Sequence, residues 1–125
     1  MRLDAHVTED PKGRRRVAAP CMEPCAIEKG MRVLGGKWTG SLLWHIKDGP
    51  VRFNDLARMV GGASKKMITE RLRFLEAKGL VSRHVRETSP VIVEYAITPL
   101  GETAIKVLDE LREWSESLPA DVVEE

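Results

Sequence analysis

The first regular pattern of apolar residues runs from Ile27 to Ile46 in steps of three and four. Residues at this spacing lie on one face of an α-helix. Gly35-Gly36 interrupts the pattern and Asp48-Gly49-Pro50 ends it, so it predicts two consecutive helices that meet at the glycine pair. The face consists of Ile27, Met31, Leu34, Trp38, Leu42 and Ile46.

Two further helices are predicted after a brief extended piece at Val51-Arg52-Phe53. The first is short and stops at Gly61-Gly62. The second begins after Ser64, whose hydroxyl can cap a helix, and runs to about Lys78 before Gly79. Its buried stripe is Ile68, Leu72 and Leu75, which leaves a polar and mostly basic opposite side.

The period then changes from helical to alternating. Residues 81–86 and 91–97 alternate around a turn at Glu87 to Pro90, which predicts a two-stranded antiparallel hairpin. Thr98-Pro99 supplies a cap and a first-turn proline for a last helix. Because the apolar stripe of that helix exceeds what a small domain needs, we expect it to pack against a second copy. The stripe is Leu100, Ala104, Val107, Leu108, Leu111 and Trp114.

The two ends of the chain show no such pattern. Residues 1–24 mix prolines, polar residues and the cluster Arg14-Arg15-Arg16, which predicts a disordered basic arm. The expected organisation is this arm, one domain over residues 25–118 and a loose acidic tail over 119–125. A chain of 125 residues is the usual size of one domain.

Charge is segregated along the chain, although the formal net charge is only +1. Residues 64–86 carry seven basic side chains against two acidic ones, a net charge of +5, whereas residues 99–125 carry eight acids against two bases, a net charge of −6. The first stretch is suited to an anionic partner and the second is not.

The order of elements, with the basic helix followed by the hairpin, predicts a winged helix-turn-helix, a mainly α fold with a β-hairpin wing. A helix about 10–12 Å across with a basic face fits the major groove of DNA. Lysines at its start favour phosphate, and Arg73 and Thr69 can reach base edges. The candidate DNA-binding residues are Ser64, Lys65, Lys66, Thr69, Arg71, Arg73, Arg83 and Arg86.

Several separated motifs resemble those of the HxlR-type family of bacterial regulators, over roughly residues 25–114. They are Cys25, GGKW at 35–38, GPVRFNDL at 49–56, SKKM at 64–67, RLRFLE at 71–76, GLV at 79–81, VEY at 93–95 and ITPLG at 97–101.

The resemblance implies a homodimeric repressor or activator that binds double-stranded DNA and dimerises through its first and last helices. It also makes Trp38 a core residue close to the dimer interface. Family members commonly carry Arg or Lys two residues after the wing proline, where this chain has Ile92, so the resemblance does not extend to a DNA contact by the wing tip. The expected interface residues are Ile27, Met31, Leu34, Trp38, Val107, Leu111 and Trp114.

Cys25 matches a position that some family members use to sense oxidants or electrophiles. A thiol at a helix N-terminus has its thiolate favoured by the helix dipole, although Glu23 and Glu28 act against this. The alternative is an inert, half-buried cysteine. A small apolar ligand bound between the first, second and last helices is a further possible signal.

Other classes of function find little support. There is no phosphate-binding loop, nucleophile elbow or paired-histidine helix, so we expect no enzyme and no cofactor. The spacing of the possible ligands does not match that of a structural zinc site, because the C-x-x-x-C pair is far in sequence from His45 and His84 and His6 is isolated. Two cysteines, no signal peptide and no membrane-spanning stretch indicate the cytoplasm. The alternative hypothesis is a protein-interaction module without an operator.

Overall fold

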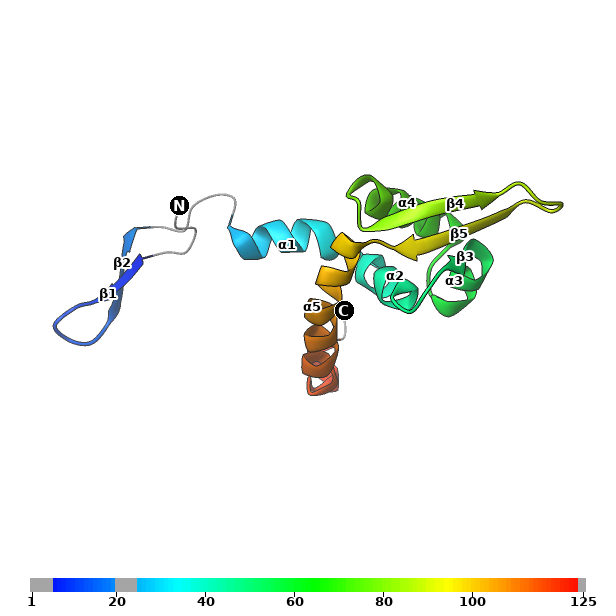
Figure 1. The fold of residues 1–125 in the computed structure, drawn as a ribbon. Coiled ribbons are helices and arrows are strands. Elements are labelled where there is room, and N and C mark those ends of the chain that lie inside the picture. The colour runs from blue at the N-terminus through cyan, green and yellow to red at the C-terminus, as the bar shows by residue number, and fades with distance from the viewer. Residues whose placement is uncertain (1–5, 20–24, 124–125) are drawn as a thin grey trace. The chain divides into compact units, whose positions relative to one another are not determined.

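The computed structural model of the chain describes residues 6–19 and 25–123, in two compact units that comprise residues 1–36 and 37–125 (Figure 1). The first unit contains β1 (His6–Glu9), β2 (Arg15–Ala19) and α1 (Ala26–Leu34). Strands β1 and β2 pair antiparallel, with Glu9 opposite Arg15 and Thr8 opposite Arg16. The prediction of an arm without regular structure is therefore wrong for residues 6–19, while residues 1–5 and 20–24 lie outside the described part.

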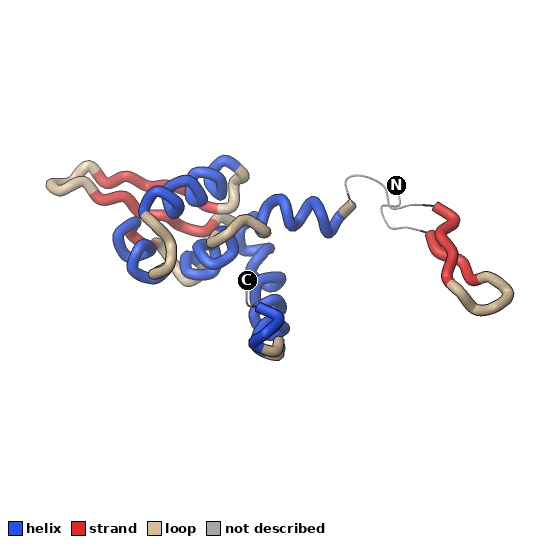
Figure 2. The backbone as a smooth tube through the Cα atoms, turned by 180° about the vertical axis from the view of Figure 1, so that it is seen from behind, coloured by secondary structure: helices blue, strands red, loops and turns tan. Residues whose placement is uncertain are grey.

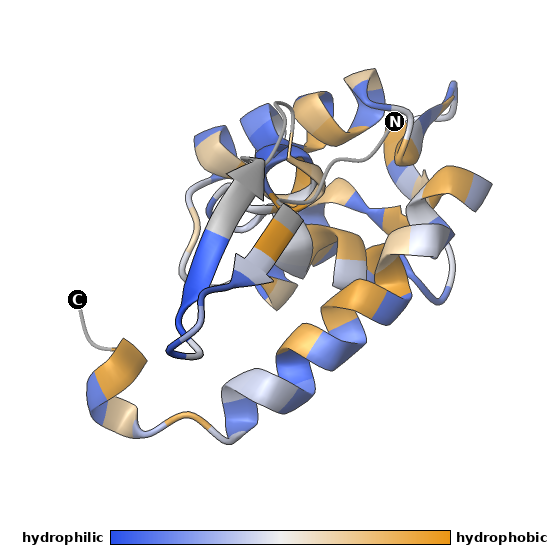
Figure 3. Cartoon of the chain, turned by 90° about the vertical axis from the view of Figure 1, so that its left-hand side faces the viewer, coloured by the Kyte–Doolittle hydropathy of each residue, from blue (hydrophilic) through white to orange (hydrophobic). Residues whose placement is uncertain are grey.

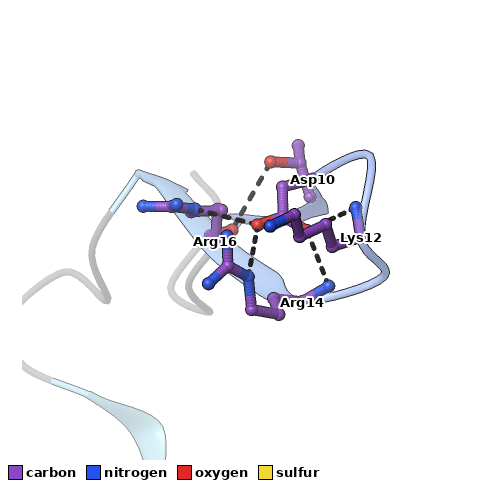
Figure 4. A network of polar contacts seen from close by, with 5 residues as sticks. Asp10, Lys12, Arg14 and Arg16 are labelled. Carbon is purple, nitrogen blue, oxygen red and sulfur yellow. Dashed lines mark hydrogen bonds and ion pairs between the residues drawn. The ribbon is translucent and has the colours of Figure 1, made fainter.

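The turn of this first hairpin is held by a single carboxylate, that of Asp10 (Figure 4). Asp10 Oδ1 accepts hydrogen bonds from the backbone N–H of Lys12 at 3.0 Å and of Arg14 at 2.8 Å. The Nε of Arg14 donates to Asp10 Oδ2 at 2.8 Å, and that of Arg16 lies 3.6 Å away. These bonds lower the pKa of Asp10, and the bond from the backbone N–H of Arg14 has the largest effect. An apolar pattern cannot reveal a turn built on polar contacts.

The second unit is a small three-stranded sheet with helices α2 to α6. Its strands are β3 (Val51–Arg52), β4 (Val81–Arg86) and β5 (Ile92–Ile97), in the order β3-β5-β4. Its helices are α2 (Thr39–Ile46), α3 (Phe53–Met59), α4 (Lys65–Ala77), α5 (Pro99–Glu116) and α6 (Ala120–Val123). The β4–β5 hairpin, the wing, extends beyond the helices in both views of the chain (Figures 1 and 2).

The predicted starts of α4 and α5 are confirmed by their caps. The hydroxyl of Ser64 accepts from the backbone N–H of Met67 at 3.1 Å, and that of Thr98 accepts from the N–H of Gly101 at 3.1 Å. Pro99 occupies the first turn of α5 as expected. Gly79 follows α4 with a φ of +78°, a conformation that glycine adopts without strain.

The core of the second unit surrounds α2, which packs against α3, α4, α5 and β5. The predicted stripe of α4 is fully buried, as is most of one side of α2. Burial of each leucine or isoleucine contributes about 1.5–3 kcal/mol to folding. The side chains with no exposed surface are Leu42, Leu43, Ile46, Leu56, Ile68, Leu72 and Leu75.

Helix α5 buries only part of its apolar stripe. Leu108 lies in the core, whereas Leu100, Val107, Leu111 and Trp114 are between 50% and 60% exposed. Figure 3 shows hydrophobic and hydrophilic residues alternating along this helix. Helix α6 occupies part of residues 119–125, the segment expected to be a loose acidic tail. The assignment of residues 25–118 to one domain stays a prediction. No helix in the described ranges could span a membrane.

Candidate nucleic-acid interface

Helix α4 presents a basic face, defined as Lys65, Lys66 and Arg73, on the side away from its buried stripe. All three side chains are exposed, and none forms an ion pair with another residue of the described part. The two lysines stand in the first turn, where free backbone N–H groups and the helix dipole also attract anions. Within the second unit, the basic face is therefore free to bind a polyanion such as DNA or RNA.

The remaining predicted residues of α4 take part in the fold. The hydroxyl of Thr69 donates to the carbonyl oxygen of Lys65 at 2.8 Å, which leaves its methyl group for a contact with a base. The Nε of Arg71, a half-buried side chain, donates to the carbonyl oxygen of Lys37 at 2.9 Å. Arg71 thus ties α4 to the segment that precedes α2, a role its position in the sequence did not reveal.

The wing contributes one unpaired arginine. Arg83 is exposed and forms no ion pair with the described residues, whereas the Nε of Arg86 lies 2.8 Å from Oε1 of Glu94 on β5. Near the tip, Val91 is 57% exposed and Ile92 is half-buried. Positions 91 and 92 of the wing therefore carry apolar rather than basic side chains, as the sequence suggests at Ile92.

A groove of about 760 Å³ runs between α3, α4 and the wing, and we call it the arginine groove. Its basic side chains come from four different elements, and its only carboxylates are Asp55 and Glu76, the first of which is paired with Arg58. The lining therefore has a net positive charge that suits a phosphate backbone. The basic members are Arg52, Arg58, Arg73 and Arg83.

Arg52 and Arg58 are absent from the residues predicted to bind DNA. Arg52 reaches the groove because β3 pairs with β5, which sets Arg52 opposite Glu94. That pairing joins residues more than forty positions apart, so no local sequence pattern predicts it. Arg58 stands one turn after Asp55 on α3, and this spacing of opposite charges was the only signal in the sequence.

The residues expected at a dimer interface are accessible to different degrees. On α1, Ile27 and Met31 are 73% and 57% exposed and Leu34 is half-buried. Trp38, at a φ of +70°, is half-buried, and its ring lies so close to Gly62 that a Cβ there would stand 2.8 Å from it. Whether these residues and the exposed stripe of α5 meet a second copy stays a prediction.

Cys25 is the residue that caps α1 at its N-terminus, and its side chain is half-buried. Its carbonyl oxygen accepts from the N–H of Lys29 at 2.8 Å. Cys21 lies outside the described residues. Within residues 6–19 and 25–123, no three His, Cys, Asp or Glu side chains are grouped closely enough to hold a metal ion.

A smaller hollow of about 240 Å³ lies between α2 and α5. Its floor is mainly apolar, and the ring of Trp44 lies at its edge with Lys47 Nζ 4.8 Å and Arg112 Cζ 5.9 Å from the ring centre. The bonds to Asp109 and Glu116 raise the pKa of Arg112, so this side chain stays charged. The lining is Gly40, Ser41, Trp44, Leu108, Leu111, Arg112 and Ser115.

The chain is similar to known regulators over most of its length. The profile of the HxlR-like helix-turn-helix family matches residues 33–121. YybR of Bacillus subtilis (strain 168), an uncharacterized HTH-type transcriptional regulator, is 41% identical over 98 residues, which are 78% of each chain.

Two solved structures resemble the fold closely. One is a transcriptional regulator of the MarR family from Porphyromonas gingivalis W83, with a TM-score of 0.74, 34% identity, and coverage of 78% of this chain and 96% of the other. The second is the redox regulator HypR in its oxidized form, with a TM-score of 0.71, 40% identity, and coverage of 76% and 98%.

Proposed function

Because the chain belongs to the HxlR-like helix-turn-helix family of transcriptional regulators, we propose that it is a one-component repressor that binds a pseudo-palindromic operator as a homodimer in the cytoplasm. The observation that supports this most is the set of exposed, unpaired cations on α4 and the wing, namely Lys65, Lys66, Arg73 and Arg83. A dimer seated over a promoter would exclude the polymerase, which is the reason for proposing repression.

In this proposal α4 enters the major groove of the DNA. Arg73 bonds the two acceptors of a guanine, and the methyl group of Thr69 packs on a thymine methyl. Lys65 and Lys66 neutralise phosphates at the start of the helix, and the arginine groove receives the backbone beside it. Two copies place two such helices in successive major grooves about 34 Å apart.

Selection of bound duplexes from a random pool tests the proposal. We expect enrichment of a sequence with two inverted half-sites, and binding of the enriched duplex that weakens steeply with salt. A module that binds only proteins would enrich no sequence and would show a flat response to salt. That result would overturn the proposal in favour of the protein-interaction function.

The exposed stripe of α5 supports the homodimer. We expect Val107→Glu to weaken self-association at least about tenfold, because a two-fold interface contains each residue twice and a carboxylate would lose its hydration there. Sedimentation velocity over a concentration series measures this. Lys106→Gln, at the next residue, changes the charge equally and is expected to leave association unchanged; an equal loss in both variants would point to charge alone.

For the signal, we propose that Cys25 responds to oxidants, because it caps α1 and because a structural relative is a redox regulator. Two Cys25 thiols of one dimer would form a disulfide and lose two protons and two electrons to the oxidant. We expect diamide to produce a covalent dimer on non-reducing gels and to change operator affinity severalfold. Cys25→Ser should abolish both effects.

Cys21→Ser is the matched control and is expected to leave both effects in place. A Cys25→Ser variant that still responds to diamide would contradict the proposal. If neither thiol matters, the hollow between α2 and α5 favours the alternative signal, a small apolar ligand.

A further inference from the structure

The hairpin β1–β2 carries a concentration of positive charge outside the surface described above. Four basic side chains, Lys12, Arg14, Arg15 and Arg16, are all exposed and face only two carboxylates, those of Glu9 and Asp10. Residues 6–19 therefore have a net charge of +2. This segment also precedes residues 33–121, the part that matches the family profile, so the family domain does not explain it.

Two of these arginines are positioned by the turn itself. The carboxylate of Asp10 lies 2.8 Å from Nε of Arg14 and 3.6 Å from Nε of Arg16, so one negative charge serves two guanidinium groups (Figure 4). Each guanidinium has further N–H donors beyond Nε. Side chains that are held in place before binding lose less conformational freedom when a ligand arrives.

The other two cations have no ion pair among the described residues. Arg15 lies opposite Glu9 in the strand register, yet the two side chains form no ion pair. Because successive residues of a strand point to opposite faces, Arg15 and Arg16 present positive charge on opposite sides of the hairpin. Lys12 adds a cation at the tip.

We propose that the β1–β2 hairpin is a second DNA-binding element, which contacts backbone phosphates of duplex DNA without reading its sequence. The proposal rests on the proposed function only in that both name duplex DNA as the partner. Arginine is suited to this role because its planar fork of donors matches phosphate oxygens. A two-stranded ribbon is also narrow enough to follow a groove.

The test uses the full chain and a fluorescein-labelled 40-bp duplex of arbitrary mixed sequence, titrated over a salt series. The test variant is Lys12→Gln with Arg15→Gln, which leaves Asp10, Arg14 and Arg16 in place. Loss of two phosphate contacts should reduce the slope of log affinity against log salt by about 1.8 per chain. Affinity near 0.1 M salt should fall roughly tenfold.

Lys29→Gln with Lys106→Gln is the matched control, because it removes two exposed positive charges elsewhere and is expected to keep the wild-type slope. If the salt slope of the test variant equals that of the control, the proposal is overturned. The cations of the hairpin would then be expected to bind an acidic protein surface instead of DNA. Absence of any binding by the wild-type chain overturns it as well.

The same titration in a Lys66→Ala, Arg73→Ala background separates this proposal from the proposed function. Residual binding that disappears when Lys12 and Arg15 are also replaced supports the hairpin even if α4 reads no operator. Residual binding that is insensitive to the hairpin substitutions contradicts the proposal while leaving the role of α4 untouched.

Discussion

The double substitution Lys66→Ala and Arg73→Ala is expected to lower affinity for the selected operator at least about a hundredfold. An arginine that bonds both acceptors of a guanine contributes about 1–3 kcal/mol of discrimination, and the loss occurs once in each subunit of a dimer. Lys66 adds a phosphate contact. Fluorescence anisotropy with the selected duplex, compared with a scrambled duplex, measures both the affinity and the preference.

The fold should not suffer from these changes, because both side chains are exposed and neither forms an ion pair with the described residues. Lys29→Ala with Lys106→Ala removes the same charge and should bind nearly as the wild type does. Arg71→Ala is different, since it removes the bond to the carbonyl oxygen of Lys37 and should lower thermal stability. Unchanged affinity of the Lys66, Arg73 variant would remove α4 from the interface.

Gly101→Ala is expected to lower the free energy of unfolding by about 2–4 kcal/mol. Gly101 is buried in the first turn of α5, and a Cβ there would stand 2.1 Å from the carbonyl oxygen of Leu80 and 2.7 Å from Cγ1 of Ile97. The carbonyl oxygen belongs to the backbone and accepts from the N–H of Thr98 at 3.1 Å, so α5 itself would have to move. Urea unfolding monitored by circular dichroism measures the loss.

Helix propensity alone predicts the opposite sign. Alanine is about 1 kcal/mol more favourable than glycine inside a helix. Gly30→Ala is the matched control, because Gly30 lies in α1 and has nothing within 4 Å of its would-be Cβ. We expect that variant to be as stable as the wild type or slightly more stable. A Gly101→Ala protein of wild-type stability would contradict the close packing of the first turn of α5 on Leu80, which lies between α4 and β4, and on Ile97 at the end of β5.

Local patterns in the sequence were sufficient for most of the second unit. Ser64 and Thr98 begin their helices as predicted, because a hydroxyl that accepts from an N–H three residues away needs no distant partner. The burial of Ile68, Leu72 and Leu75 also follows from their spacing, which puts them on one face wherever the helix packs. The exposed basic face of α4 is the necessary counterpart of that stripe.

Features that depend on distant or polar partners were missed. The disordered arm expected at residues 6–19 is a hairpin, because the carboxylate of Asp10 supplies bonds that no apolar pattern records. The Nε of Arg71 donates to a carbonyl oxygen thirty-four positions earlier, a contact that the sequence does not predict, while the DNA-binding role of this residue stays a prediction. Arg52 and Arg58 were omitted, because only the assembled sheet and helices make them part of the groove.

The sequence by itself determined where α4 and α5 begin, which side of α4 is buried and which side is basic, since these follow from interactions within a few residues. The tertiary structure alone decided that β3 joins the sheet, that four arginines from separate elements line one groove, and that Gly101 admits no larger residue. The reason is physical: strand pairing and close backbone approach join residues far apart in the chain, and their partners are fixed only when the whole unit packs.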